Sequence, residues 1–410
     1  MRRNKVGVWI IGALGSVSTT VLIGALALRK GLITETGMVT AMEPFQPLNL
    51  TPATELEFGG CDIRRGSLHD SAYHLFQETR AIDFRILKEV EEDLRGLDSV
   101  IQPGTARHCG EAIESLADRS AGQEMSLLEE VEIIRASLRS FKTARDLDVL
   151  VVMNLASTEP PLEIQDFHHD IDAFESRLKA NDHQVARAST LYTYAAILED
   201  CPYINFTPSN GGLIPALIQM AESHGIPVFG NDGKTGETLV KSALAPMFHC
   251  RNLEILSWEG FNLLGNMDGN VLDHPANCES KRKTKDQVLK NILGYAPHSR
   301  VHIHYVPSLD DQKTAWDFVH FKGFLGAKMS CQFVWQGYDS LLAAPLVLDL
   351  IRMAELAKRR LESGLMPQLA CFFKAPLGVY EHSLSAQFDL LTEYVENVRQ
   401  ESSRKLRTVG

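Results

Sequence analysis

The chain has 410 residues, of which 44% are hydrophobic and 23% charged, and a formal net charge of −11. Its length predicts two domains, or one domain with a large insertion. The composition is typical of a globular protein, and the acidic balance excludes a broad basic surface for nucleic acid or an anionic membrane. The seven cysteines are scattered without a CxxC pair, so we expect reduced thiols in a cytoplasmic protein rather than disulfides or a zinc site.

The N-terminus allows two interpretations. Basic residues within 1–5, followed by an apolar run to Leu28, imitate a secretory signal. We favour a buried strand over 6–11, a turn at Gly12-Ala13-Leu14-Gly15 and a helix over about 18–28, because serine and threonine at 16–20 suit a helix N-terminus. Such a unit can hold the pyrophosphate of a dinucleotide. The turn has only two glycines, however, so a glycine turn of any α/β protein fits it equally well.

Strands and helices alternate through the first 230 residues. We expect strands at 55–60, 148–155, 203–206 and 227–229, and helices at 79–97, 123–145, 183–199 and 212–223. This alternation predicts a parallel sheet covered on both faces. Asp62 follows a double-glycine turn at the end of one strand, where it can accept hydrogen bonds from a ribose or simply lie in a solvated turn.

The pattern changes near residue 236. A helix at 237–245 is followed by strands at 253–258, 301–306 and 329–334, and a helix at 341–361 can carry the chain back. We therefore predict an α/β fold in which a first domain over 1–235 is interrupted by a mixed α/β domain over 236–365. Residues 366–410 would return to the first domain.

Three segments between residues 230 and 285 would be energetically unfavourable if they served the fold alone, so we interpret them as functional. They are Gly230-Asn-Asp-Gly-Lys-Thr-Gly-Glu-Thr238, Asn262-Leu-Leu-Gly-Asn-Met-Asp-Gly-Asn270 and Ser280-Lys-Arg-Lys-Thr-Lys285. Glycines, asparagines and aspartates crowd the ends of apolar runs, and a dense set of cations follows. This combination is typical of a site for an anionic, hydroxyl-rich ligand.

Seven segments occur in order along nearly the whole chain. They are Phe58-Gly-Gly-Cys-Asp-Ile63, Asn154-Leu-Ala-Ser-Thr-Glu159, Gly230-Asn-Asp-Gly-Lys-Thr-Gly236, Asn262-Leu-Leu-Gly-Asn-Met-Asp-Gly269, Asp311-Gln-Lys313, Asp339-Ser-Leu-Leu-Ala-Ala-Pro345 and Lys374-Ala-Pro-Leu377. Together they resemble the myo-inositol-1-phosphate (inositol-3-phosphate) synthase family. The resemblance implies an NAD-binding Rossmann domain interrupted by a catalytic and tetramerisation domain, assembled as a homotetramer. It also implies conversion of D-glucose 6-phosphate to 1D-myo-inositol 3-phosphate.

The implied reaction has no net redox change. NAD+ oxidises C5, a proton leaves C6, the enolate attacks the C1 aldehyde, and the retained NADH reduces C5 again. Negative charge on the C5 oxygen and on O1 needs ammonium groups in a water-poor cavity. By resemblance, Lys374 and Lys313 would transfer the proton at the C5 oxygen and Lys281 would polarise O1. The implied catalytic residues are Lys281, Lys313, Lys374, Lys285, Asp232 and Asp339.

The resemblance also implies two binding sets. The cofactor set is Gly12, Ala13, Leu14, Gly15, Ser16, Asp62, Ser157, Thr158, Asp232 and Asp268, and the substrate set is Thr235, Gly236, Asn262, Asn266 and Lys285. Without the family, Lys374 still stands out, because an unpaired ammonium in its apolar run is expensive. Without the family, we would interpret Lys281 and Lys285 as solvated lysines. The aspartates at 232 and 268 would be turn residues, and Asp339 would be a helix cap.

Several positions depart from the family pattern. Glu237 stands where glutamine is usual, Leu263 where histidine is common, and 310–313 and 337–339 also differ. A related cyclase acting on another sugar phosphate therefore stays open, as do an ordinary NAD(P) dehydrogenase and a catalytically silent NAD- or sugar-phosphate-binding regulator. We expect no metal site, since His302, His304 and the pair at 168–169 lack convincing cysteine or carboxylate partners.

Overall fold

The computed structural model describes residues 4–117, 125–265 and 288–409. Its larger sheet has seven parallel strands in the order β11-β6-β5-β4-β1-β2-β3. The strands are β1 (Val6–Ile11), β2 (Glu57–Asp62), β3 (Ile101–Pro103), β4 (Val149–Asn154), β5 (Tyr203–Asn205), β6 (Pro227–Phe229) and β11 (Gly364–Leu365).

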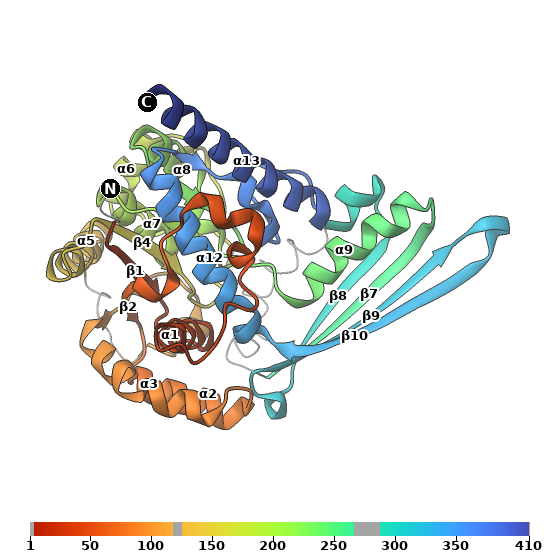
Figure 1. The fold of residues 1–410 in the computed structure, drawn as a ribbon, viewed down its shortest axis with the longest axis horizontal. Coiled ribbons are helices and arrows are strands. Elements are labelled where there is room, and N and C mark those ends of the chain that lie inside the picture. Colours follow the sequence, from red (N-terminus) through yellow and green to blue (C-terminus); the bar gives the residue numbers. More distant parts are fainter. Residues whose placement is uncertain (1–3, 118–124, 266–287, 410) are drawn as a thin grey trace.

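Helices cover both faces of this sheet (Figure 1). On one face lie α1 (Ser16–Arg29), α2 (Leu68–Thr79), α3 (Phe84–Leu97), α12 (Asp339–Arg359) and α13 (Leu384–Val409), and on the other α4 (Glu111–Glu114), α5 (Leu127–Ala144), α6 (Ile171–Lys179), α7 (Ala188–Leu198) and α8 (Pro215–Ser223). Strand β1 shows why both faces are covered, because Val8 and Ile10 belong to the apolar cluster on one face and Trp9 and Ile11 to the cluster on the other. Successive side chains of a strand point to opposite faces, so a strand covered on both sides reads as a continuous apolar run.

Short 3-10 turns connect these elements. They are η1 (Val39–Ala41), η2 (Glu43–Leu48), η3 (Ala53–Glu55), η4 (Asp98–Val100), η5 (Asp166–His168), η6 (Asn210–Leu213), η7 (Pro307–Leu309), η8 (Phe324–Gly326) and η9 (Pro367–Phe372). None of the helices in the described ranges combines the length and the apolar character needed to cross a bilayer.

A second sheet projects from this body (Figure 1). Its order is β10-β9-β7-β8, formed by β7 (Glu254–Leu264), β8 (His298–Tyr305), β9 (Gln312–Lys322) and β10 (Lys328–Tyr338). The β7–β8 pair is parallel and the other two pairs are antiparallel. Helix α9 (Gly236–Cys250) covers one face, where Phe248 meets Trp258 edge to face at 6.3 Å between ring centroids. Phe248, Trp258 and Val319 belong to the core of this part.

The predicted α/β class is confirmed, and so is the strand–turn–helix interpretation of the N-terminus, since β1 and most of α1 are buried. The return to the first sheet begins earlier than the expected residue 366. Helix α12 packs against α1, and β11 pairs with β6 of the larger sheet. We therefore propose that the insertion covers 236–338 rather than 236–365.

Candidate functional site

The turn between β1 and α1 has the geometry of a phosphate-binding turn. Gly12 has a φ of 82°, and a Cβ there would lie 3.0 Å from Cα of Ala156, so the position requires glycine. Helix α1 begins at Ser16 with Gly15 as its N-cap, and no side chain caps it. The first N–H groups of α1 and the helix dipole therefore favour an anion beside the turn.

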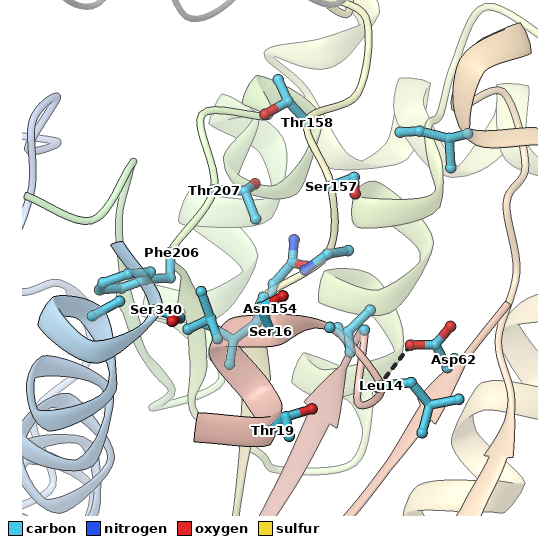
Figure 2. Close-up of a pocket in the computed structure, with 18 of the residues that line it drawn as sticks. Leu14, Ser16, Thr19, Asp62, Asn154, Ser157, Thr158, Phe206, Thr207 and Ser340 are labelled. Atoms are coloured by element: carbon cyan, nitrogen blue, oxygen red, sulfur yellow. Dashed lines mark hydrogen bonds between the residues drawn. The ribbon is translucent and has the colours of Figure 1, made fainter. Parts of the chain in front are cut away.

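Asp62 fixes this turn from the end of β2. Its Oδ2 accepts a hydrogen bond from the N–H of Leu14 at 2.8 Å (Figure 2). Its Oδ1 accepts from the N–H of Arg64 at 2.9 Å and from the Nε of the same arginine at 3.3 Å. The carboxylate thus holds the glycine turn in place. Its expected contact with a ribose stays a prediction.

One cavity of about 410 Å³ joins the two ends of the expected site. Its lining includes Gly12, Leu14, Gly15, Ser16, Asp62, Ser157 and Thr158 at one end and Asp232, Thr235, Asp339 and Lys374 at the other. Ser157 and Thr158 follow β4 in the chain and line the same cavity, and Figure 2 shows them on the segment beyond Asn154. Ala13 is 1% exposed and is not among the lining residues. Residues predicted for the nucleotide and for the sugar therefore share one cavity.

Lys374 and Asp232 form a buried ion pair in this cavity. Nζ of the lysine lies 2.8 Å from Oδ1 of the aspartate, and the two residues are 7% and 3% exposed. Backbone contacts position the pair, because the N–H of Lys374 donates to the carbonyl of Asp232 and the N–H of Asn231 donates to the carbonyl of Ala375. A buried ammonium is tolerated when a carboxylate compensates for its lost hydration.

A second lysine–aspartate pair lies where β9 meets α12. Nζ of Lys313 is 2.9 Å from Oδ2 of Asp339, whose Oδ1 accepts a hydrogen bond from Oγ1 of Thr235 at 3.1 Å. Asp339 is in the first turn of α12 and Tyr338 is the N-cap, so the expected capping role is wrong. The helix dipole stabilises a carboxylate at this position. A Cβ on Gly236 would lie 3.8 Å from Nζ of Lys313, so the Thr235–Gly236 backbone borders this pair.

Besides Ala13, three predicted residues of the described structure do not line this cavity: Lys313 and Gly236, which adjoin its lining residues Asp339 and Thr235, and Asn262. Asn262 is 1% exposed on β7, with its Nδ2 3.5 Å from the carbonyl of His302, and it does not line the cavity. Its role in substrate binding stays a prediction. The other four predicted residues, Asn266, Asp268, Lys281 and Lys285, lie outside the described residues.

Sequence reasoning missed a buried amide network beside the cavity. Nδ2 of Asn205, at the end of β5, donates to Oδ1 of Asn231 at 2.7 Å, and Oδ1 of Asn205 accepts from Oγ1 of Thr207 at 2.8 Å. Asn154, at the end of β4, donates to the same oxygen at 3.3 Å. The carboxyl ends of adjacent parallel strands meet at one edge, which is the signal that would have connected these asparagines.

A second missed contact joins Ser340 to Asp311. Oγ of Ser340 donates to Oδ2 of Asp311 at 2.6 Å, and both residues line the cavity. Asp311 lies only two residues before Lys313, inside one of the segments that carry the family resemblance.

The expectation that His302 lacks a carboxylate partner is wrong. Its Nε2 lies 3.2 Å from Oε2 of Glu259, and Nε2 of His298 lies 2.9 Å from Oε1 of the same glutamate. The reason is strand pairing, because β7 and β8 place these side chains on one face of the sheet. Within the described ranges, no three histidine, cysteine or acidic side chains gather to hold a metal ion.

Known proteins are similar to this chain over most of its length. A family model for myo-inositol-1-phosphate synthase, designated as NAD-binding, matches residues 6–396. Inositol-3-phosphate synthase 1 of Bacteroides thetaiotaomicron is 33% identical, over 95% of this chain and 93% of its own length. The Dictyostelium discoideum inositol-3-phosphate synthase is 30% identical, over 87% of this chain and 75% of its own length.

Solved structures give the same result for the fold. The inositol-3-phosphate synthase of Caenorhabditis elegans has a TM-score of 0.87 at 25% identity, with 97% of this chain and 86% of that chain covered. A myo-inositol-1-phosphate synthase-related protein from Thermotoga maritima has a TM-score of 0.78 at 24% identity, with 95% and 98% covered. The second likeness concerns the fold alone.

Proposed function

Because this chain belongs to the myo-inositol-1-phosphate synthase family of enzymes, we propose that it converts D-glucose 6-phosphate to 1D-myo-inositol 3-phosphate with NAD. The observation that supports this best is the single cavity running from the glycine turn to Lys374, Asp232 and Asp339. A nucleotide on the turn and a sugar phosphate beside the lysine–aspartate pairs would meet inside it.

The residues of the turn fit a dinucleotide. Gly12 allows close approach of the backbone, and the uncapped start of α1 offers N–H groups to a pyrophosphate. Asp62 lies at the end of the second strand, where a ribose binds in this fold, and Ser157 and Thr158 offer hydroxyl groups from the next loop. NAD, when bound, supplies a hydride acceptor that also returns the hydride, so the overall reaction needs no external oxidant.

The two ammonium groups are assigned to the C5 oxygen. Lys374 and Lys313 each hold a proton against a carboxylate, at 2.8 and 2.9 Å, in a mostly buried environment. An ammonium in such a place can donate to an oxygen that gains negative charge and can take the proton back. Asp232 and Asp339 orient the two lysines, which keeps both donors directed as the charge develops.

The substrate phosphate is assigned to the start of α9. Thr235 and Gly236 lie there, next to the Lys313–Asp339 pair, so a phosphate bound to their N–H groups would place the sugar toward the lysines. We assign polarisation of O1 to Lys281 and an added phosphate donor to Lys285 by family resemblance.

Phosphorus NMR of the protein with glucose 6-phosphate and substoichiometric NAD+, read together with the NADH absorbance band, tests this proposal. A new inositol phosphate resonance without accumulated NADH is the expected result. Accumulated NADH would mean an ordinary dehydrogenase. If NAD+ binds and neither change occurs, a different sugar phosphate or a non-catalytic binder replaces the proposal.

We also propose a cytoplasmic homotetramer. Phe324 and Leu325, at the tip of the β9–β10 hairpin, are each 89% exposed, and Val334 on β10 is 61% exposed. Large exposed apolar side chains on a projecting sheet support burial against another subunit. Free, buried thiols such as Cys61 and Cys201 support a reducing compartment. Light scattering after size-exclusion chromatography tests the tetramer.

A further inference from the structure

Glu237 lies in the first turn of α9, directly after Thr235 and Gly236. A carboxylate that faced the proposed phosphate position would repel the substrate. In the structure, this side chain is 1% exposed, and its Oε1 lies 2.7 Å from Nζ of Lys241, one helical turn later. The acid that departs from the family pattern is therefore paired inside the protein.

Gly260 on β7 makes room for this carboxylate. A Cβ at that position would lie 2.6 Å from Oε1 of Glu237 and 3.3 Å from Nζ of Lys241. Asp317 on β9 completes the set, with its Oδ1 3.8 Å from Nζ of Lys241 and accepting a hydrogen bond from Nε1 of Trp258 at 2.7 Å. The three charged side chains are no more than 1% exposed, and charges so deeply buried stay together because separation would leave each without hydration.

The same helix and strand also carry the proposed catalytic groups. Asp317 and Lys313 are four residues apart on β9 and therefore lie on one face of that strand. Thr235 is the N-cap of α9 and donates to Asp339, which also pairs with Lys313. Lys241, which pairs with Glu237, thus connects α9 to Asp317 of β9, and the Thr235–Asp339–Lys313 contacts connect the start of α9 to the start of β9.

We propose that Glu237 is a positioning residue for the phosphate-binding turn. Lys241 pairs with its carboxylate and Gly260 leaves room for it beside β7, which fixes the first turn of α9 and keeps the negative charge away from the substrate phosphate. The inference rests on the proposed sugar phosphate substrate. It also explains how a phosphate site tolerates glutamate at this position.

Calorimetric titration of the full-length protein with glucose 6-phosphate, and separately with inorganic phosphate, tests this inference. Lys241→Met is expected to weaken binding of both about tenfold or more, because Glu237 loses its partner and its charge repels the phosphate. Adding Glu237→Gln to that variant is expected to restore affinity to within about threefold of wild type, since the repelling charge is gone. Asp317→Asn, added to Lys241→Met instead, is the matched control and is expected to leave binding weak.

Gly260→Ala provides an independent route if Lys241→Met does not fold. Its Cβ displaces the carboxylate of Glu237, so phosphate binding should again weaken about tenfold. Gly24→Ala is the matched control, because a Cβ on Gly24 meets nothing within 4 Å, and phosphate affinity should not change.

Three results would overturn the inference. The first is Glu237→Gln alone tightening phosphate binding about tenfold, because the carboxylate would then already face the phosphate. The second is equal rescue of Lys241→Met by Glu237→Gln and Asp317→Asn. The third is a wild-type protein that binds neither phosphate compound. Failure of the proposed function gives a different result, in which phosphate binding follows the expected pattern while no inositol phosphate is made.

Discussion

Replacing Lys374 with methionine separates a catalytic ammonium from one that only balances charge. The change keeps the length of the side chain and leaves Asp232, which is 3% exposed, without the ammonium now 2.8 Å away. Removing one partner of a buried ion pair costs about 3–5 kcal/mol. Because the cavity reaches both residues and can admit water, we expect a loss near the lower end, about 3 kcal/mol, in the free energy of unfolding.

The double variant Lys374→Met/Asp232→Asn removes both charges. Its unfolding free energy should recover to within about 1 kcal/mol of wild type, because no uncompensated charge stays buried. Its turnover should stay reduced by about 10³-fold or more, because the donor to the C5 oxygen is still missing. Urea unfolding and phosphorus NMR of product formation measure the two quantities separately.

Lys358→Met is the matched control for this experiment. Lys358 pairs with Asp200 at 2.6 Å, but the aspartate side chain is 65% exposed. The carboxylate that Lys358→Met leaves behind is therefore hydrated, so the change should cost less than about 1 kcal/mol and leave turnover unchanged. Full turnover in the double variant would refute the assigned role of Lys374, and a stability loss below about 1 kcal/mol in the single variant would refute the buried pair.

Three further predictions concern the first sheet and its helices. Asp62→Ala leaves the N–H of Leu14 without its acceptor, so the affinity for NADH, measured by fluorescence titration, should fall about tenfold. Unchanged affinity would mean that the glycine turn keeps its conformation without Asp62. Gly60→Ala places a Cβ 2.3 Å from the carbonyl oxygen of Ile10 and should cost about 2–3 kcal/mol in urea unfolding, and a loss within error would contradict the tight β1–β2 contact. Burial raises the pKa of Asp349 from 3.8 to about 6, so the folded state binds a proton at this carboxyl more tightly than the unfolded chain does. Protonation of Asp349 therefore stabilises the folded state at low pH, and this stabilisation is lost as the pH rises from 3.8 through about 6. Asp349→Asn should remove this pH-dependent loss of stability. The difference in Tm between the variant and the wild type should therefore change between pH 3.8 and 6, and a constant difference would contradict the prediction.

Five of the seven strands of the first sheet were predictable, because burial on both faces produces continuous apolar runs, whereas the short strands β3 and β11 were missed. Strand β1 was expected over 6–11 and has those bounds. Strand β9 was missed because its inward face is mixed: Lys313 and Asp317 point into the protein beside the core residue Val319, while Trp316 and Phe318 lie on the opposite face. Polar residues inside and aromatic residues outside do not indicate a strand until the ion pairs that accommodate them are known.

The candidate site, too, was predictable from the sequence only in part. Motifs identified Lys374 and Asp232, but 142 residues separate them, and only the fold brings their side chains to 2.8 Å. The partner of Glu237 was visible in the sequence, since Lys241 follows at the i,i+4 spacing of helical ion pairs. The room that Gly260 provides for that pair comes from a different strand and depends on tertiary packing, which no local pattern contains.

Deuterium at C5 of glucose 6-phosphate tests the central claim of an internal oxidation and reduction most directly. The protein is given this labelled substrate with a large excess of unlabelled NAD+, and the product is analysed by deuterium and phosphorus NMR. An inositol phosphate that keeps the deuterium on the same ring carbon, with no label in the NAD pool, is the predicted result. Label released into the NAD pool, or a product with hydrogen at that carbon, would contradict it.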